Sequence, residues 1–304
     1  MLSYLALAAV SIIWGTTYLA LRIGVKEFPP FLLVAIRQTT AGMLVLAALF
    51  FSGTRVQLPA ALLGRQTVAG FLMITLGNGL VAWSEVYIPS GVAAVLCSAL
   101  PVAVILVNLA AYGIRPSATV VVGTVIGLAG MLLMFSEHLD ELVNKEYRLG
   151  IGCTLLAVLS WAAGSVWLKS REGASNPFLN AGLQMLTGGV LCLPFSLWLD
   201  GPHPEEISST VLYALGYLVL FGSVIAYASY LYALKTLPLA VVSLYAYINP
   251  VVAVILGWVV LDEKLNLKIG IAVAIVLLGI FLVNRAAITQ RLRSRREQGA
   301  VLQK

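Results

Sequence analysis

The stretch "YIPSGVAAVLCSALPV" covers residues 87–102, and a similar stretch, "TLPLAVVSLYAYINPV", covers residues 236–251. Each has a proline, then two small or apolar residues, then an apolar run interrupted by a second proline. Pro89 is matched by Pro238 and Pro101 by Pro250, in both cases 149 positions later. A pattern that returns at one fixed distance indicates an internal repeat, and the composition shows which kind of element is repeated.

Apolar residues make up 60% of the chain and charged residues only 11%, against about 25% charged in an ordinary soluble domain. Each of the apolar segments has close to the ~20 residues that cross a ~30 Å hydrocarbon core as a helix. The sequence therefore predicts an all-α, multi-pass membrane protein. The ten segments are 3–24, 31–51, 66–86, 90–111, 118–135, 149–169, 178–199, 210–234, 238–260 and 267–284.

The first segment has no basic leader and no clear cleavage site, so we interpret it as a retained helix. The connections between segments are short, the longest being "SEHLDELVNKEYR", and leave no room for a soluble catalytic domain. The function is therefore expected among the helices.

Lysine and arginine predict the orientation, because cytoplasmic loops carry most of them. With the C-terminal end inside, twelve lie in the cytoplasm and six outside, which places both termini in the cytoplasm. The basic tail, 287–304, then lies against anionic lipid, and we expect no nucleic-acid partner. The twelve are Arg55, Arg65, Arg115, Lys169, Arg171, Lys235, Arg285, Arg291, Arg293, Arg295, Arg296 and Lys304; the six are Arg22, Lys26, Lys145, Arg148, Lys264 and Lys268.

The repeat extends beyond the opening stretch. Trp14 is matched by Trp161, and "PPFLLVAIRQTTAG" (29–42) by "NPFLNAGLQMLTGG" (176–189), each 147 positions later. The chain thus divides into 1–140 and 141–286, with five helices in each half. Because five is odd, the second half enters the membrane from the opposite face. Two inverted five-helix repeats around a midplane cavity are a recurring plan of secondary transporters.

Several motifs in order carry a family resemblance. The paired "WGTTYLALR" and "SWAAGSVWLK", the "SGVAAVLCSALPV" run, and the "FGSVIAYASYLYAL", "YAYINPVVAVILG" and "LDEKL" series resemble the EamA family of the drug/metabolite transporter superfamily. The resemblance covers about residues 5–284 and is greatest to its YedA-type and PecM-type permeases. It implies transport of small metabolites or drugs across the bacterial inner membrane, usually as export, and leaves the substrate open.

The sequence offers no pattern of residues that indicates an enzyme active site. The two histidines, His138 and His203, lie in acidic loops, and neither HExxH nor GxSxG occurs. Cys97, Cys153 and Cys192 stand singly in apolar segments, as small hydrophobic residues do. We expect no enzyme activity, no metal and no cofactor. The absence of GxxxxGK[ST] also excludes direct use of ATP unless a separate subunit supplies it.

Charged groups within a span are costly and need a partner or a water-filled cavity. Arg37 lies about 10 Å into the second span at helical rise, and its counterpart is the neutral Gln184. It either anchors an anionic substrate group, pairs with Glu85, or extends to the membrane surface. Glu85, two turns beyond Asn78, either carries a proton, neutralises Arg37 or lies at the interface.

Aromatic residues gather in the second half, at Tyr227, Tyr230, Tyr232, Tyr245 and Tyr247, and Trp83 is the counterpart of Tyr232. With Asn249 nearby, such rings suit a pocket for flat or amphipathic molecules. The alternatives are an interfacial aromatic belt or simple helix packing.

Two pairs of equivalent residues complete the candidate site. Trp14 and Trp161 either line the pocket or pack in a seam beside glycines. Pro101 and Pro250 lie inside spans, where a missing amide bends a helix, and are predicted hinges.

The sequence thus predicts a secondary transporter, an exporter of amino acids or related amphipathic molecules that works by alternating access. A passive channel or a non-transporting membrane scaffold is the alternative, although a channel needs a continuous polar face that is not seen. The expected partners are a small-molecule substrate and the lipid bilayer. The oligomeric state is open, and a monomer is possible.

Overall fold

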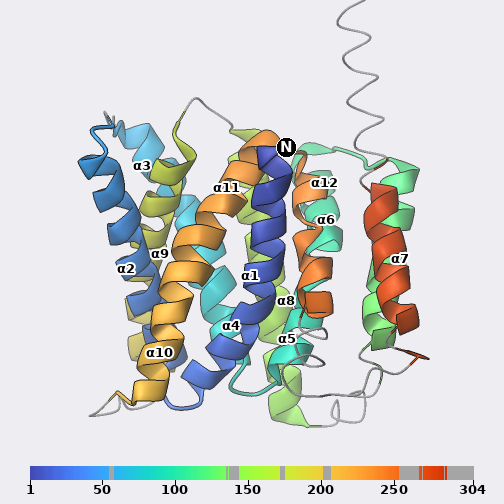
Figure 1. Ribbon diagram of the computed structural model, residues 1–304, viewed down its shortest axis with the longest axis horizontal. Helices are drawn as coiled ribbons and strands as arrows, with labels where there is room; N and C mark the ends of the chain where they lie inside the picture. Colours follow the sequence, from blue (N-terminus) through green and yellow to red (C-terminus); the bar gives the residue numbers. More distant parts are fainter. Residues whose placement is uncertain are drawn as a thin grey trace, which may run out of the picture.

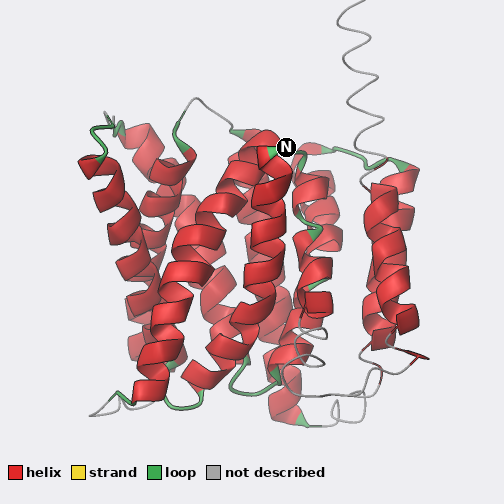
Figure 2. Cartoon of the chain, in the orientation of Figure 1, coloured by secondary structure: helices red, strands yellow, loops and turns green. Residues whose placement is uncertain are grey.

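The computed structural model of the protein is a bundle of long helices (Figures 1 and 2). It describes residues 1–54, 58–134, 136, 144–171, 175–200, 207–252, 267–268, 270–283 and 285, and these residues form helices and loops without a strand. The basic tail at 287–304, both histidines and the "LDEKL" stretch lie outside the described residues.

Seven helices have the length and apolarity to cross a membrane, and three shorter apolar helices accompany them in the described part of the chain. All of them overlap the predicted apolar segments. The long ones are Leu2–Val25 (α1), Pro30–Phe51 (α2), Ala60–Ser84, Ser90–Tyr112, Lys145–Ser170 (α8), Pro177–Leu199 (α9) and Ser209–Thr236. The shorter ones are Ala118–Met134 (α7), Leu239–Val252 and Gly270–Val283.

Prolines set where several helices begin. Pro89 and Pro238, the first prolines of the repeated stretch, directly precede α5 (Ser90–Cys97) and α12 (Leu239–Val242). Pro59 likewise precedes Ala60, so the third span begins six residues before the predicted residue 66. In each case the proline fixes its own φ near −60° and takes an extended conformation just ahead of the helix.

Two spans contain a π-helical segment in the middle. Within Ala60–Ser84, η1 separates α3 from α4, and within Ser209–Thr236, η3 separates α10 from α11. The two π segments have eight residues each and begin 147 positions apart, at 71 and 218, the offset of the sequence repeat. The bounds are α3 Ala60–Gly70, η1 Phe71–Asn78, α4 Gly79–Ser84, α10 Ser209–Tyr217, η3 Leu218–Ile225 and α11 Ala226–Thr236.

The π segments join the spans across the bundle. Trp14 Nε1 of α1 donates to the carbonyl of Gly222 in η3 at 2.9 Å. Ser160 Oγ of α8 donates to the carbonyl of Leu72 in η1 at 2.7 Å. π segments are rare and occur often at functional sites. Here their carbonyls anchor α1 and α8.

The helices that contain the second prolines of the repeated stretch are interrupted. Turn residues 98–99 separate α5 from α6 (Leu100–Tyr112), which begins immediately before Pro101. Turn residues 243–244 separate α12 from the helix containing Pro250. A proline lacks the amide hydrogen and crowds the carbonyl four residues earlier, which accounts for the break before Pro101. Whether these points bend during transport stays a prediction.

Among the described residues the buried side chains form a large core, a four-residue cluster around Ile88, and a smaller core at one edge of the bundle. The smaller core joins α7 to the helix after α12 and to Gly270–Val283, and α7 lies next to Gly270–Val283 at one edge of the bundle (Figure 1). Tyr247 Oη donates to the carbonyl of Thr124 at 2.9 Å and ties this edge to the rest. The smaller core consists of Val95, Met131, Leu244, Tyr247, Val251, Val276 and Val283.

Candidate functional site

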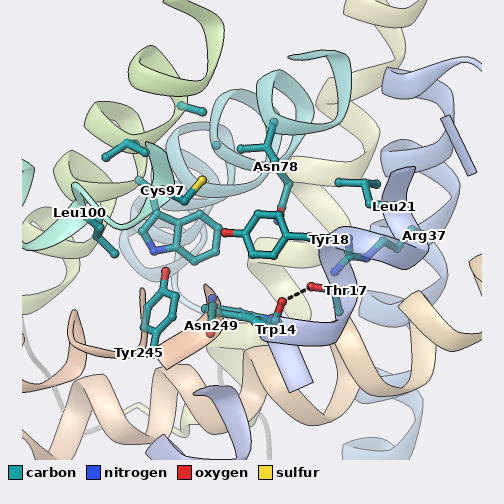
Figure 3. A pocket seen from close by; sticks show the side chains of 15 residues that line it. Trp14, Thr17, Tyr18, Leu21, Arg37, Asn78, Cys97, Leu100, Tyr245 and Asn249 are labelled. Carbon is teal, nitrogen blue, oxygen red and sulfur yellow. Dashed lines mark hydrogen bonds between the residues drawn. The ribbon is translucent and has the colours of Figure 1, made fainter. Parts of the chain in front are cut away.

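A cavity of about 80 Å³ lies inside the bundle, where spans of both halves meet (Figure 3). Its walls come from α1, α2, the π segment η1 with α4, the junction of α5 and α6, α8, and the helix after α12. The lining residues are Trp14, Thr17, Tyr18, Leu21, Arg37, Gly77, Asn78, Val81, Cys97, Leu100, Ala157, Val158, Trp161, Tyr245 and Asn249.

Aromatic rings form one wall of this cavity. The rings of Trp14 and Trp161 meet edge to face, with centroids 5.4 Å apart and planes at 86°. Tyr245 packs on Trp14 at 4.8 Å, and Tyr230 contacts both tryptophans from behind at 5.3 and 5.6 Å. Tyr227 stacks on Tyr230 at 6.2 Å. Rings in such contact hold each other rigidly, so the wall offers a fixed apolar surface with hydroxyl tips.

Arg37 supplies the positive charge of the cavity. Its side chain is only 4% exposed, and it lies across the cavity from Tyr245 (Figure 3). Within the described part of the chain the guanidinium makes one hydrogen bond, from Nε to Ser223 Oγ at 2.8 Å. A guanidinium has five N–H donors, so most of them are available to an acceptor in the cavity.

The counterpart of Arg37 in the second half is hydrogen-bonded to two protein side chains. Gln184 donates from Nε2 to Gln66 Oε1 at 2.5 Å and accepts from Tyr227 Oη at 2.6 Å. The two equivalent side chains therefore differ in how many of their hydrogen-bonding groups the protein uses. The second half fills the position with a neutral amide bonded to two protein side chains, and the first half leaves a cation with unused donors beside the central cavity.

Glu85 lies apart from the cavity. Its side chain is fully buried, and neither carboxylate oxygen has a hydrogen-bond partner among the described residues. A direct Arg37–Glu85 bond, one of the alternatives, is therefore not formed in this structure, and Glu85 does not lie on the protein surface.

Two amides complete the polar lining. Asn78 is the last residue of η1 and borders the cavity. With its nitrogen assigned toward the backbone, Asn249 donates to the carbonyls of Ser11 and Tyr245 at 2.8 and 3.0 Å. Asn249 thereby ties the helix after α12 to α1 at the edge of the cavity.

The structure brings most of the predicted site residues together. Six line the cavity, and two more, Tyr227 and Tyr230, pack directly behind the tryptophans. Trp83 does not line it and instead contacts Tyr87, with centroids 5.2 Å apart. The predicted hinges Pro101 and Pro250 each follow a lining residue, Leu100 and Asn249. The six are Trp14, Arg37, Asn78, Trp161, Tyr245 and Asn249.

Three contributors were missed by the sequence analysis. Tyr18 and Cys97 line the cavity, and Ser223 orients Arg37. Tyr18 follows Trp14 by four residues, a spacing that places both on one helix face, so it could have been found. Nothing local to Ser223 or Cys97 distinguishes them from other small polar residues of the spans. Among the described residues no group of three or more His, Cys, Asp or Glu side chains gathers to hold a metal ion.

The sequence and the fold can be compared with those of known proteins. The sequence pattern that defines the EamA-like transporter family matches residues 1–136 and 148–285. The chain belongs to the EamA-like transporter family. As a member of this family it is a membrane transporter protein, which agrees with its apolar helices.

Two relatives of this EamA-like chain, YedA and YoaV, are named as transporters. The inner membrane transporter YedA of Escherichia coli strain K12 is 34% identical, over 91% of this chain and 89% of its own length. The transporter YoaV of Bacillus subtilis strain 168 is 22% identical over 91% and 95%. The protein PecM of Dickeya dadantii strain 3937 is 28% identical over 84% and 82%.

A solved crystal structure shows the same fold. It superposes with a TM-score of 0.76 at 21% identity and covers 95% of this chain and 98% of its own. At that identity the likeness concerns the fold alone.

Proposed function

We propose that this EamA-like chain is a secondary transporter that moves a small amphipathic zwitterion, such as an amino acid, through the cavity beside Arg37, in the direction of export. The observation that carries the proposal is the unused hydrogen-bonding capacity of Arg37 at a cavity lined by aromatic rings. No carboxylate among the described residues is hydrogen-bonded to the buried Arg37, and a buried cation without such a partner is costly. A substrate carboxylate would supply the partner through two parallel hydrogen bonds.

The aromatic wall suits the rest of such a substrate. Trp14, Trp161 and Tyr245 offer ring faces and edges to an apolar side chain or to an ammonium group. A sugar nucleotide fits poorly, since its two phosphates require more than one buried cation, and Arg37 is the one cationic side chain among the lining residues.

The size of the cavity supports alternating access. About 80 Å³ is well below the about 300–1,000 Å³ typical of small-molecule pockets, so the spans must separate to admit a metabolite. The interrupted helices at 98–99 and 243–244 adjoin the lining residues Leu100 and Tyr245. They are the proposed points of movement, with Pro101 and Pro250 as hinges.

The two halves, 1–140 and 141–286, are proposed to be inverted five-helix repeats with both termini in the cytoplasm. The paired prolines before α5 and α12 and the paired π segments support the repeat, because each pair keeps the offset seen in the sequence. The excess of lysine and arginine at one end supports the orientation.

Uptake into proteoliposomes tests this function. Purified protein is reconstituted, and transport of a panel of radiolabelled amino acids, aromatic cations and nucleotide sugars is measured with and without an opposing substrate gradient. We expect counterflow of at least one amino acid or amino-acid-like compound, and its loss in Arg37→Ala. Transport of nucleotide sugars alone contradicts the proposed substrate class. Flux that lacks saturation and counterflow indicates a passive channel.

A further inference from the structure

Four cationic side chains converge at one end of the bundle, outside the central cavity. Arg65 donates from Nη1 to the carbonyl of Arg171 and from Nη2 to Ser175 Oγ at 3.2 Å. Lys235 Nζ donates to the carbonyl of Ser175 at 3.0 Å, and Lys169 Nζ to that of Leu234 at 2.9 Å. The start of α3 and the end of α11 lie at the same end as the N-terminus (Figure 1).

This cluster of Arg65, Lys169, Arg171 and Lys235 surrounds a small cavity of about 50 Å³. None of the described residues that line the cavity is an Asp or a Glu. Arg65, Arg171 and Lys235 bring like charges to one cavity, where they repel one another and favour an anionic ligand. The backbone carbonyls that they contact orient the side chains but carry no net charge.

An apolar groove of about 640 Å³ adjoins the cluster between α3 and α8, and it shares Arg65 and Arg171 with the smaller cavity. Ala61, Leu62, Gly64 and Val68 form one wall, and Trp167 forms the other. Val68 is 40% exposed, and a side chain at Gly64 would meet nothing within 4 Å. The groove therefore has room along α3 for an extended apolar chain.

Two hydrogen-bond donors at the junction of groove and cluster lack acceptors. Arg65 Nε and Trp167 Nε1 are buried and have no partner among the described residues. The Arg171 guanidinium lies over the Trp167 ring, 3.5 Å from its centroid, which holds the cation at the mouth of the groove. Buried donors without a partner are rare in native proteins and call for an explanation.

We propose that this end of the bundle binds an anionic phospholipid, with its phosphate between Arg65 and Arg171 and one acyl chain in the groove between α3 and α8. A cationic cluster that continues into an apolar groove matches a ligand with an anionic head and an apolar tail. A soluble anion leaves the groove uncovered, and a zwitterionic lipid brings no net negative charge to Arg65 and Arg171. Anionic lipids attract basic residues on the cytoplasmic side, which is where the orientation proposed above places this end.

Native mass spectrometry of the purified full chain tests whether the protein binds an anionic phospholipid in preference to a zwitterionic one. Dioleoyl phosphatidylglycerol is titrated against dioleoyl phosphatidylcholine, and lipid-bound and lipid-free protein are compared. We expect a clear preference for phosphatidylglycerol. The double variant Arg65→Gln with Arg171→Gln should weaken its binding about 30-fold, since each cation near an anionic surface contributes about fivefold. The control is Arg115→Gln, because Arg115 is an exposed loop residue that lines neither cavity. This variant should change phosphatidylglycerol binding less than about fivefold.

A second variant leaves all four cations in place. Gly64→Phe projects a ring into the groove, where a side chain meets open space, and should lower phosphatidylglycerol binding through loss of the acyl-chain contact. Gly152→Phe is the matched control, because Gly152 on α8 also faces open space but is not part of the groove. Thermal unfolding in phosphatidylcholine shows that each variant is folded.

Inorganic phosphate distinguishes a lipid from a free anion. We expect phosphate at millimolar concentration to displace little phosphatidylglycerol, because it cannot replace the tail. The proposal is overturned if phosphatidylglycerol binds no better than phosphatidylcholine, or if Gly64→Phe leaves its binding unchanged while phosphate competes fully. That second result identifies a soluble-anion site.

Discussion

Trp14 and Trp161 contact each other edge to face, with ring centroids 5.4 Å apart, although 147 positions separate them in the chain. They occupy equivalent places in the two halves. Two equivalent side chains touch only close to the axis that relates their repeats, so this contact marks the proposed two-fold axis. Because both rings line the cavity, the axis and the candidate substrate site coincide.

The two tryptophans differ in their indole nitrogens, and this gives a first prediction. Trp14 Nε1 donates to the carbonyl of Gly222, whereas Trp161 Nε1 has no partner among the described residues. Trp14→Phe should lower the free energy of unfolding by about 1 kcal/mol more than Trp161→Phe, because only the former loses a hydrogen bond. Thermal unfolding in detergent measures the difference. Equal losses in the two variants contradict it.

Arg37 gives a second prediction. Arg37→Ala should lower transport about 10- to 100-fold, the effect of losing a charge-assisted hydrogen bond, and leave folded protein in the membrane. Arg37→Lys should recover only part of the activity, because an ammonium cannot bind a carboxylate through a planar fork. The measurement is initial uptake into proteoliposomes. Failure of both Arg37→Ala and Glu85→Ala to fold indicates instead that the two charges stabilise the structure.

A substitution at Ser223 tests whether transport requires Arg37 to be held in its orientation. Ser223→Ala keeps the charge of Arg37 but removes the acceptor of its Nε hydrogen, now at 2.8 Å. We expect a smaller loss of transport than in Arg37→Ala, seen mainly as a higher KM. The matched control is Ser196→Ala on α9, since Ser196 Oγ is buried but has no partner among the described residues. An equal effect of both serine variants argues against an orienting role.

The close pairing of α7 with Gly270–Val283 gives a fourth prediction. A Cβ added at Gly279 would lie 2.6 Å from the carbonyl oxygen of Gly123, so the two backbones must move apart. Gly279→Ala should destabilise the protein by about 1–3 kcal/mol. Gly270→Ala, in the same helix but facing open space, should be neutral or stabilise by up to about 1 kcal/mol. Thermal unfolding compares the two.

Cysteine labelling tests the orientation. In a chain whose three native cysteines are replaced by alanine, Ser117→Cys and Lys26→Cys each introduce one exposed thiol, in loops at opposite ends of the bundle. A membrane-impermeant maleimide added to whole cells should label the cysteine at position 26 and not the one at position 117. The reverse pattern places the termini outside.

The sequence by itself determined the membrane helices, because an apolar run of about 20 residues is a local property that needs no partner to be recognised. It also located the repeat, and Trp14, Trp161 and Arg37 stood out through their paired positions or their charge within a span. The helix starts after Pro89 and Pro238, close to the predicted residues 90 and 238, follow from the fixed φ of proline. The start after Pro59 has the same cause, but the third span was predicted to begin only at residue 66.

The tertiary structure alone decided which polar groups meet. Position along a helix predicts the depth of Arg37 and Glu85, but their contact also depends on how each helix is rotated about its axis. That rotation is set by packing with several neighbours at once. Arg37 consequently bonds to Ser223, far away in the chain, while Glu85 stays without a hydrogen-bond partner among the described residues. For the same reason Tyr18 lines the cavity and Trp83 does not.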